Sequence, residues 1–448
     1  MRGTLLIALA CAGCTPWASQ DERRDAQVSA DARVPADADA ADARVSTDAD
    51  AADSGRGPCP ALSERATQRR DVAILGDETW SCDNVYVLGG EVHVHAPATI
   101  TIEPGTVVMA EDEAALVFRP GARLVADGRP EAPIVFTSDD APLSRSPGEW
   151  RGLALMGRAA PVGTLAEGLE TNLAYGGTDD AHDCGTLRYV RIEWAGDNID
   201  DPQEGNATLG GLVLAGCGTG TVVDFVQVHQ SEWEGIKVRG GSVRLRHLVL
   251  TESGDEALEW AGGWTGSAQY VLARQQSSGG VALQADGPGR GPIIANATLV
   301  GMVGTRQARD GFFADDEAEA VITNAIFTGW SNSVLDVEDS SVSTAGEPPL
   351  LRVDRSITFF SPLQPVREEA DGFDEQAHLA AVARMNRLDL DPLLVDTTIS
   401  FDLRPGAESP VGIVGCPDDA RVDSGACYAG GLAPGEDDWS IGWTNLAE

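Results

Sequence analysis

The chain has 448 residues, of which 70 are acidic and 32 are lysine or arginine, and its formal net charge is -38 at neutral pH. A body this acidic repels nucleic acid and anionic membrane surfaces, which excludes both as electrostatic partners. Cations and neutral glycans stay open as ligands.

The N-terminus has the layout of an export signal. One arginine precedes a short apolar run and small residues before Cys14, as in a cleavable signal peptide. Residues 1–14 resemble a lipoprotein signal with its lipobox, in which Cys14 receives the lipid. Because Cys11 stands where leucine is usual, acylation at Cys11 and ordinary cleavage without lipid stay open. We expect an exported protein that is lipid-anchored to the bacterial outer membrane or cell surface and meets membrane only through this lipid.

Residues 15–58 consist almost entirely of Ala, Asp, Arg, Ser, Val and Pro. This composition has too little apolar bulk to form a core, and its negative charge favours an extended chain. We interpret the segment as a disordered acidic Ala/Asp-rich tether.

Six further cysteines follow. An even number in an exported chain favours disulfides over metal ligands. Their spacing favours bridges between nearest neighbours, although other pairings stay open: Cys59 with Cys82, Cys184 with Cys217, and Cys416 with Cys427.

The folded body begins near Cys59 and consists of short strands separated by turn residues. One series of β-branched and aromatic segments starts at residues 189, 225, 247, 270, 297 and 325, and a second series alternates with it at 235, 257, 281, 311 and 334. Two interleaved strand series with one repeat per coil predict a solenoid. The fold class is therefore all-β, a right-handed parallel β-helix over residues 59–345. Asn296 and Asn324 occupy equivalent positions, as expected for asparagines stacked at a coil turn.

Several motifs carry a family resemblance. They are TIEPGTVV (101–108), ARLVADG (122–128), PIVFTS (133–138) and the C-terminal CYAGGLAPGEDDWSIGWTNL (427–446). Together they resemble a family of bacterial surface lipoproteins with right-handed parallel β-helix, pectate-lyase-like repeats, over nearly everything from Cys82 onward. The resemblance implies the fold but no established biochemical activity. The family's paired-aspartate motif is eroded here in SEWEGIKV and SGGVALQADG, which weakens any calcium ladder inferred from it.

Acidic residues gather at the predicted coil edges. Like charges on neighbouring strands repel, so these side chains must either extend into water or hold a hard cation such as Ca²⁺. The calcium hypothesis names Asp310, Asp315 and Asp336. A third interpretation is carboxylate catalysis with Arg239 or Arg274 as basic partner, but we assign no catalytic residue. The whole set is Asp255, Glu256, Glu259, Asp286, Asp310, Asp315, Asp316, Asp336, Glu338 and Asp339.

Four tryptophans, Trp233, Trp260, Trp264 and Trp330, fall in the same coil-edge region. Aromatic faces there stack on sugar rings if exposed, and are ordinary packing residues if buried. The candidate glycan-binding set is Trp233, Trp260, Trp264, Asp255, Glu256 and Asp286.

His93 and His95 lie two residues apart on one predicted strand and so share a face, which would suit a metal. No third ligand is evident in the sequence.

The C-terminal residues 346–448 are expected to form a small helical and disulfide cap. An amphipathic helix is predicted over 373–387, with Phe373, Ala377, Ala380, Ala381 and Met385 broadly on one side. A solenoid needs its open end covered. We expect this helix, the Cys416–Cys427 loop, Trp439 and Trp443 to cover it.

The leading functional hypothesis is a non-catalytic cell-surface lipoprotein, expected to be a monomer, that binds extracellular polysaccharide or an envelope protein or serves as a structural module. The alternative is a polysaccharide lyase or glycoside hydrolase that acts in a groove along the β-helix near Asp255 to Asp316. No cofactor other than Ca²⁺ is suggested.

Overall fold

The computed structural model describes residues 58–448 except 167, 202–204, 276–279, 303–308, 339–340, 347–348, 367–372, 398–400 and 447–448. The predicted signal with Cys11 and Cys14, the tether up to residue 57, and Asp339 lie outside the described residues. No helix of the described part is both long and apolar enough to cross a membrane.

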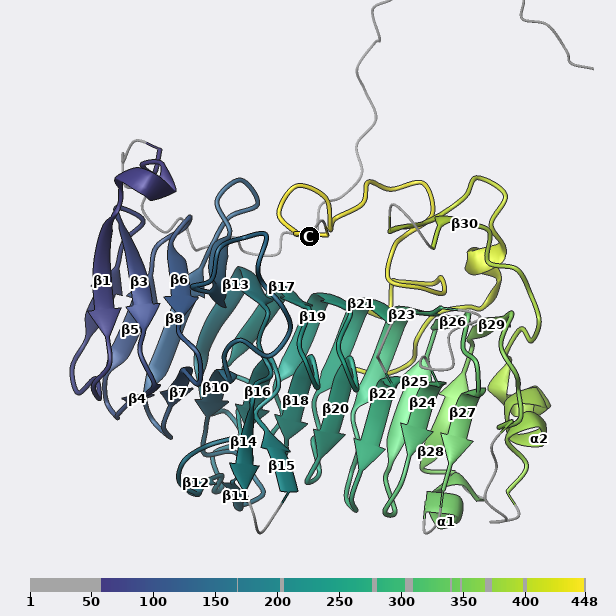
Figure 1. Cartoon of the computed structure of the whole chain (residues 1–448). Helices are drawn as coiled ribbons and strands as arrows, with labels where there is room; N and C mark the ends of the chain where they lie inside the picture. The colour runs from purple at the N-terminus through teal and green to yellow at the C-terminus, as the bar shows by residue number, and fades with distance from the viewer. Residues whose placement is uncertain are drawn as a thin grey trace, which may run out of the picture. The chain divides into compact units, whose positions relative to one another are not determined.

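Two parallel sheets run side by side along a parallel β-helix, which confirms the predicted fold class (Figure 1). The larger sheet has 16 described strands: β1 (Ala66–Arg70), β2 (Glu78–Trp80), β3 (Asn84–Leu88), β5 (Thr99–Ile102), β6 (Val107–Ala110), β8 (Arg123–Asp127), β9 (Ile134–Ser138), β13 (Gly185–Glu193), β17 (Val222–His229), β19 (Arg244–Thr251), β21 (Ser267–Gln275), β23 (Ile293–Gly301), β25 (Ala320–Thr323), β26 (Ile326–Thr328), β28 (Leu351–Asp354) and β29 (Ile357–Phe359).

The smaller sheet has nine described strands in the order β4, β7, β10, β16, β18, β20, β22, β24 and β27. Their bounds are β4 (Glu91–Val94), β7 (Ala115–Phe118), β10 (Gly152–Met156), β16 (Leu212–Ala215), β18 (Ile236–Arg239), β20 (Leu258–Ala261), β22 (Val281–Asp286), β24 (Asp310–Ala314) and β27 (Ser333–Val337).

The remaining described elements are short. Three antiparallel pairs are β11 (Gly163–Leu165) with β12 (Leu173–Tyr175), β14 (Asn198–Asp201) with β15 (Gly205–Thr208), and β30 (Leu394–Asp396) with β31 (Asp402–Pro405). The helices are η1 (Leu62–Glu64), α1 (Val342–Ala345), α2 (Glu375–Ala380), η3 (Val382–Arg384) and η4 (Pro410–Ile413).

Alternation along each strand builds the interior. In β18, for example, Ile236 and Val238 enter the core, whereas Lys237 and Arg239 point outward. Each coil places apolar residues above those of the coil before it, as in Ile236 opposite Leu258 and Leu258 opposite Leu283. One continuous core therefore runs from Ile74 to Leu379.

From β13 onward, a corner of each coil in the larger sheet is made by one residue in the left-handed conformation. Tyr189, Phe225, His247 and Tyr270 hold this place in successive coils, with φ between 48° and 61°. Their rings stack, with centroids 4.5, 4.2 and 4.8 Å apart. Bulky residues resist this conformation, so the stack supplies part of the energy that maintains it.

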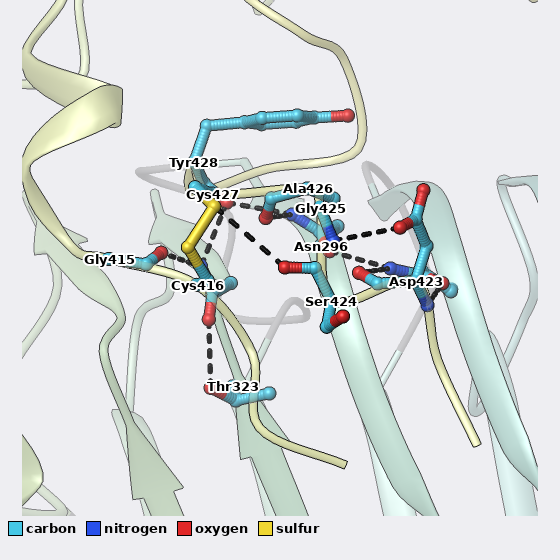
Figure 2. The surroundings of a disulfide bond; sticks show 12 residues. Asn296, Thr323, Gly415, Cys416, Asp423, Ser424, Gly425, Ala426, Cys427 and Tyr428 are labelled. Carbon is cyan, nitrogen blue, oxygen red and sulfur yellow. Dashed lines mark hydrogen bonds between the residues drawn. A yellow bond between two sulfur atoms is a disulfide. The ribbon is translucent and has the colours of Figure 1, made fainter. Parts of the chain in front are cut away.

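Asn296 and Asn324 continue the same corner, with φ of 50° and 55°, and both are fully buried. The expected asparagine positions at a coil turn are present. The Asn296 amide donates to the carbonyls of Ala426 and Tyr428 at 3.2 and 2.7 Å, as Figure 2 shows. The corner therefore binds the C-terminal part of the chain.

The three predicted disulfides are present: Cys59–Cys82, Cys184–Cys217 and Cys416–Cys427. The Cys416–Cys427 bridge closes the loop whose carbonyls receive the asparagine amides (Figure 2). Beyond this loop, residues 428–446 run back toward β13 and β17 (Figure 1). Asn445 bonds Gln227 of β17 at 2.8 Å through its N–H group.

The expected location of the cap is wrong for Trp439 and Trp443. Trp443 packs edge-on against Tyr189 and Phe225, and Trp439 packs edge-on against His247. Both tryptophans therefore cover the corner along the side of the solenoid, because the stacked rings there offer a large apolar surface.

The end of the solenoid is covered by α2, which packs on β27, the last strand of the smaller sheet. The predicted helix 373–387 is wrong in length, since Ala381 adopts an extended conformation and ends α2. Its predicted face is wrong as well. The buried residues are Glu375, Leu379 and Arg384, whereas Ala377, Ala380, Ala381 and Met385 are exposed and Phe373 is half-buried.

The strand ladder also continues past residue 345. β28 pairs with β25, and β29 pairs with β26. The predicted end of the solenoid therefore falls one coil too early. The sequence between 345 and 351 lacks the regular spacing of the earlier repeats.

The contacts of Trp443 make a prediction about stability. Replacing this buried indole with alanine opens a void against Tyr189 and Phe225, so Trp443→Ala is expected to cost about 3–5 kcal/mol. Thermal unfolding and limited proteolysis of the C-terminal segment measure the loss. Ile441→Ala is the control, because Ile441 is 66% exposed. Equal melting temperatures for Trp443→Ala and wild type would contradict a stabilising role for the segment.

Candidate functional site

The outward side chains of four neighbouring strands of the smaller sheet form a surface that we call the polar face. Register places Lys237 of β18 beside Glu259 of β20, then Gln284 of β22 and Phe313 of β24. A second row places Arg239 beside Ala261 and Asp286. The polar face consists of Lys237, Arg239, Glu259, Gln284, Asp286 and Phe313.

The polar face is bounded on one side. On the earlier strands β7, β10 and β16, the outward residues are apolar and packed beneath Leu165, Leu173 and Leu209. The segment that contains β11 and β12 therefore covers the outer side of these strands (Figure 1). From β18 onward most outward residues are charged or polar, with Ala261 and Phe313 as exceptions, and Arg239, Gln284, Asp286 and Phe313 stay half-buried.

Lys237, the single lysine of the chain, is buried at the edge of the polar face. Its ammonium lies 2.8 Å from a Glu234 carboxylate oxygen and donates to the Thr208 carbonyl at 3.1 Å. Arg239 donates to Glu259 at 2.7 Å. Both cations of the polar face are thus engaged by carboxylates.

Three carboxylates meet beside Lys237. Glu234, Asp255 and Glu256 each offer an oxygen, and these oxygens lie within 4.8 Å of one another. Glu234 and Glu256 hold equivalent places in consecutive coils, since the Gly235 N–H donates to the Glu256 carbonyl at 2.8 Å. Burial raises the pKa of Glu256 strongly, and the neighbouring charges of Asp255 and Glu259 raise it further. Burial also raises the pKa of Glu234, although Lys237 opposes that shift.

This arrangement brings together two of the predicted site residues, Asp255 and Glu256, and adds Glu234, which the sequence reasoning missed. The sequence contained a signal for Glu234, because the turn segments SEWEG (231–235) and SGDEA (253–257) of consecutive coils align Glu234 with Glu256. The three groups reduce their repulsion by keeping a proton on Glu256 or by sharing a hard cation. Asp286 stands at the outer end of β22, and burial together with the Glu259 charge raises its pKa.

The two buried glutamates should respond differently to loss of charge. Burial raises the pKa of Glu256 and so favours its protonated form, which glutamine resembles in shape. Glu256→Gln is therefore expected to cost less than about 1 kcal/mol at neutral pH. Glu234→Gln removes the partner of a buried ammonium and is expected to cost about 3 kcal/mol. Chemical denaturation of both variants measures the difference. A Glu256→Gln variant as unstable as Glu234→Gln would mean that Glu256 is ionised and paired with a cation.

The calcium set named from sequence is not brought together. Asp310 begins β24 and Asp315 follows its other end, so a strand's length separates them. Asp310 and Asp336 do meet, because the Asn332 amide donates to both, at 2.8 and 3.1 Å. Asp315 instead lies with Asp316 in the turn that faces Asp286, and both raise the pKa of Asp286. Glu338 is half-buried beside Asp336.

Asp336 gives a pH-dependent prediction. Burial, then the charges of Asp310 and Glu338, raise its pKa to about 7. Between about pH 4 and 7 the folded protein keeps this proton and the unfolded chain has lost it, so wild-type stability falls as pH rises through that window. Asp336→Asn removes this loss and should be more stable than wild type by about 1–3 kcal/mol at pH 8 but not at pH 4.

Melting curves across this pH range, with a chelator present, test the prediction. Asp316→Asn is the control, because it removes the same charge from an exposed turn. An Asp336→Asn variant whose advantage does not change with pH would show that Asp336 titrates near its ordinary value.

The tryptophans were left open between sugar stacking and ordinary packing, and packing is confirmed for three of the four. Trp260, Trp264 and Trp330 are 3%, 0% and 1% exposed and belong to the core. Trp264 donates to the Val243 carbonyl and Trp330 to the Leu299 carbonyl, so their polar atoms are satisfied inside. Of the four, Trp233 alone is half-buried. The aromatic residue of the polar face is Phe313, which the sequence reasoning missed although alternation with the buried Phe312 indicates it.

His93 and His95 do not form a metal centre with described residues. His93 contacts Glu91 at 2.6 Å, and Glu91 also lies 3.5 Å from Arg151. The two imidazole centroids are 6.2 Å apart. His93 therefore takes part in an ion-pair group at the N-terminal end of the smaller sheet.

A family model described as a pectate-lyase like beta helix domain matches residues 73–380. The chain belongs to this family, in agreement with the stacked parallel sheets. No curated protein and no solved structure matches the chain. Three disulfides are typical of proteins that fold outside the cytoplasm, so the folded part is consistent with an extracellular protein. Membership of the family suggests a carbohydrate-related function without distinguishing binding from cleavage.

Proposed function

We propose that the protein is a non-catalytic, exported module that binds extracellular polysaccharide at the polar face. The observation that carries the proposal is a half-buried group on two adjoining coils, with Gln284 and Asp286 on β22 and Phe313 beside Gln284 on β24. An aromatic face beside amide and carboxylate groups matches a sugar ring, which has apolar C–H faces and a polar edge.

The charges of this surface support binding over catalysis. Cleavage of acidic polysaccharide by proton abstraction needs a basic group free to take a proton. Lys237 and Arg239 are both engaged by carboxylates, which stabilise their protonated forms. The cations of the polar face are neutralised by carboxylates, and the net negative charge of the chain repels anions at long range. Neutral glycans therefore suit this surface better than acidic ones.

The same proposal includes export and a lipid anchor at Cys14, with residues 15–58 as a tether between membrane and β-helix. The disulfides support export, because such bonds persist in oxidising compartments. The layout of residues 1–14 supports lipidation. A non-catalytic module of this kind could instead bind an envelope protein or serve a structural role.

The second candidate is a glycoside hydrolase or polysaccharide lyase. Its support is the contact of Glu256, which has a strongly raised pKa, with Asp255 and Glu234. A protonated carboxyl group next to an ionised one is the arrangement that glycosidases use for general acid catalysis.

The experiment compares binding with product formation. A panel of neutral oligosaccharides is titrated by calorimetry into the full folded protein, and reaction mixtures are assayed for new reducing ends and unsaturated products. We expect binding without products, and at least a tenfold loss of affinity in Phe313→Ala, equivalent to about 1.4 kcal/mol. Phe360→Ala is the control, since Phe360 is exposed on a different part of the solenoid.

Two results would contradict the proposal. Product formation that Asp286→Ala or Asp315→Ala abolishes would establish the enzyme instead. Equal affinity of Phe313→Ala and wild type would remove the polar face as the binding surface.

A further inference from the structure

A second surface, on the larger sheet, concentrates arginine in this acidic chain. Two adjoining pockets of about 210 Å³ each lie where residues 419–423 cross the first halves of the long strands. Arg244 and Arg246 of β19 line the first pocket, Arg290 and Arg352 line the second, and Arg421 lines both. We call these five residues the arginine flank.

Three of these guanidinium groups have no carboxylate within ion-pair distance in the described part of the chain, although Arg244 lies near enough to Asp419 to help Arg421 lower the pKa of that carboxyl group. Arg244, Arg246 and Arg290 are exposed and form no ion pair there, although Arg246 lies over the Tyr270 ring at 5.4 Å. Acidic residues outnumber basic ones by 70 to 32, so carboxylate partners are plentiful elsewhere. Arginines left unpaired in such a chain are available to an external anion.

Hydrogen bonds of Arg421 fix the shape of the arginine flank. Its guanidinium binds Asp419 at 2.8 and 2.9 Å and donates to the carbonyls of Thr265 and Gly291 at 3.1 and 3.3 Å. It still remains 27% exposed. This network holds the C-terminal segment against the sheet and fixes the wall that the two pockets share. The first pocket also has a rigid floor, since the buried Gln269 bonds Asp423 and Asn296.

The coil repeat determines the spacing of the charges. Arg244 and Arg352 occupy the same register position four coils apart. The strand partners that link them are Ser267, Ile293 and Val321. At about 4.8 Å per step the two arginines are about 19 Å apart, and Arg290 precedes the strand midway between them. Arg352 is also paired with Asp354 at 2.8 Å, and Asp423 and Glu319 contribute carboxylates to the lining of the two pockets. The flank still offers guanidinium groups at intervals along the solenoid axis, which fits an extended polymer with repeated anionic groups better than one small anion.

We propose that the arginine flank binds an acidic glycan, a polysaccharide that carries carboxylate groups at regular intervals. Guanidinium groups bind carboxylates through two parallel N–H···O bonds, and neighbouring pockets give room for successive sugars. The negative charge of the whole chain opposes the approach of a polyanion, so contact depends on short bidentate pairs. This inference does not rest on the polar face, which lies on the other sheet.

The test uses hexagalacturonate as probe and calorimetry at low ionic strength with the full folded protein. We expect measurable binding by wild type and at least a tenfold loss in the double variant Arg244→Gln/Arg290→Gln. Arg129→Gln is the control, because Arg129 is exposed and lies at the N-terminal end of the solenoid. Melting temperatures check that all variants fold. Phe313→Ala should bind the probe as wild type does, which separates this site from the polar face.

Maltohexaose, a neutral probe of equal length, should not respond to the arginine substitutions. The inference fails if wild type does not bind hexagalacturonate or if the double variant binds it unchanged. It also fails if vesicles with phosphatidylglycerol bind through these arginines while hexagalacturonate does not, since the flank would then recognise lipid phosphate.

Discussion

The structure depends on the corner at which each coil of the larger sheet, from β13 onward, bends through a single left-handed residue. An L-residue in this conformation costs roughly 1–2 kcal/mol, and this chain places Tyr, Phe and His there, with Asn in the later coils. Two interactions offset the cost. The rings stack on one another, and the asparagine amides bond to carbonyls of the C-terminal segment. Because both work through neighbouring coils, no coil is stable alone.

The same corner explains why the C-terminal segment belongs to the fold. Asn296 and Asn324 are fully buried, and a buried amide without acceptors costs about 1–3 kcal/mol. The carbonyls of Ala426 and Tyr428 provide acceptors, and the Cys416–Cys427 bridge holds their loop. Residues beyond 428 then cover the aromatic stack. The surfaces left outside are the polar face on one sheet and the arginine flank on the other.

The sequence predicted those features that alternation controls. The strand series, the solenoid and the disulfides follow from spacing, and the structure confirms them. The sequence could also have decided between packing and sugar stacking for Trp260, because Trp260 has the same strand parity as Leu258, which is inward. The predicted helix failed for another reason. Its apolar residues are mostly alanines, which bury little area, so the contacts of Leu379, Glu375 and Arg384 decide its orientation.

The position of the C-terminal segment involves pairs such as Gln227 and Asn445, 218 residues apart, which no local pattern reveals.

Burial also bears on whether the carboxylate cluster does chemistry. A general acid must come within hydrogen-bond reach of the glycosidic oxygen. Glu256 is 4% exposed and Glu234 is 8% exposed, so the two groups with raised pKa values are largely withdrawn from solvent. The more accessible acids are Asp255 and Asp286, and the nearest cations are bound to Glu234 and Glu259. Burial also explains how three carboxylates can lie together in one corner, since it raises the pKa of Glu256 and so favours its protonated form.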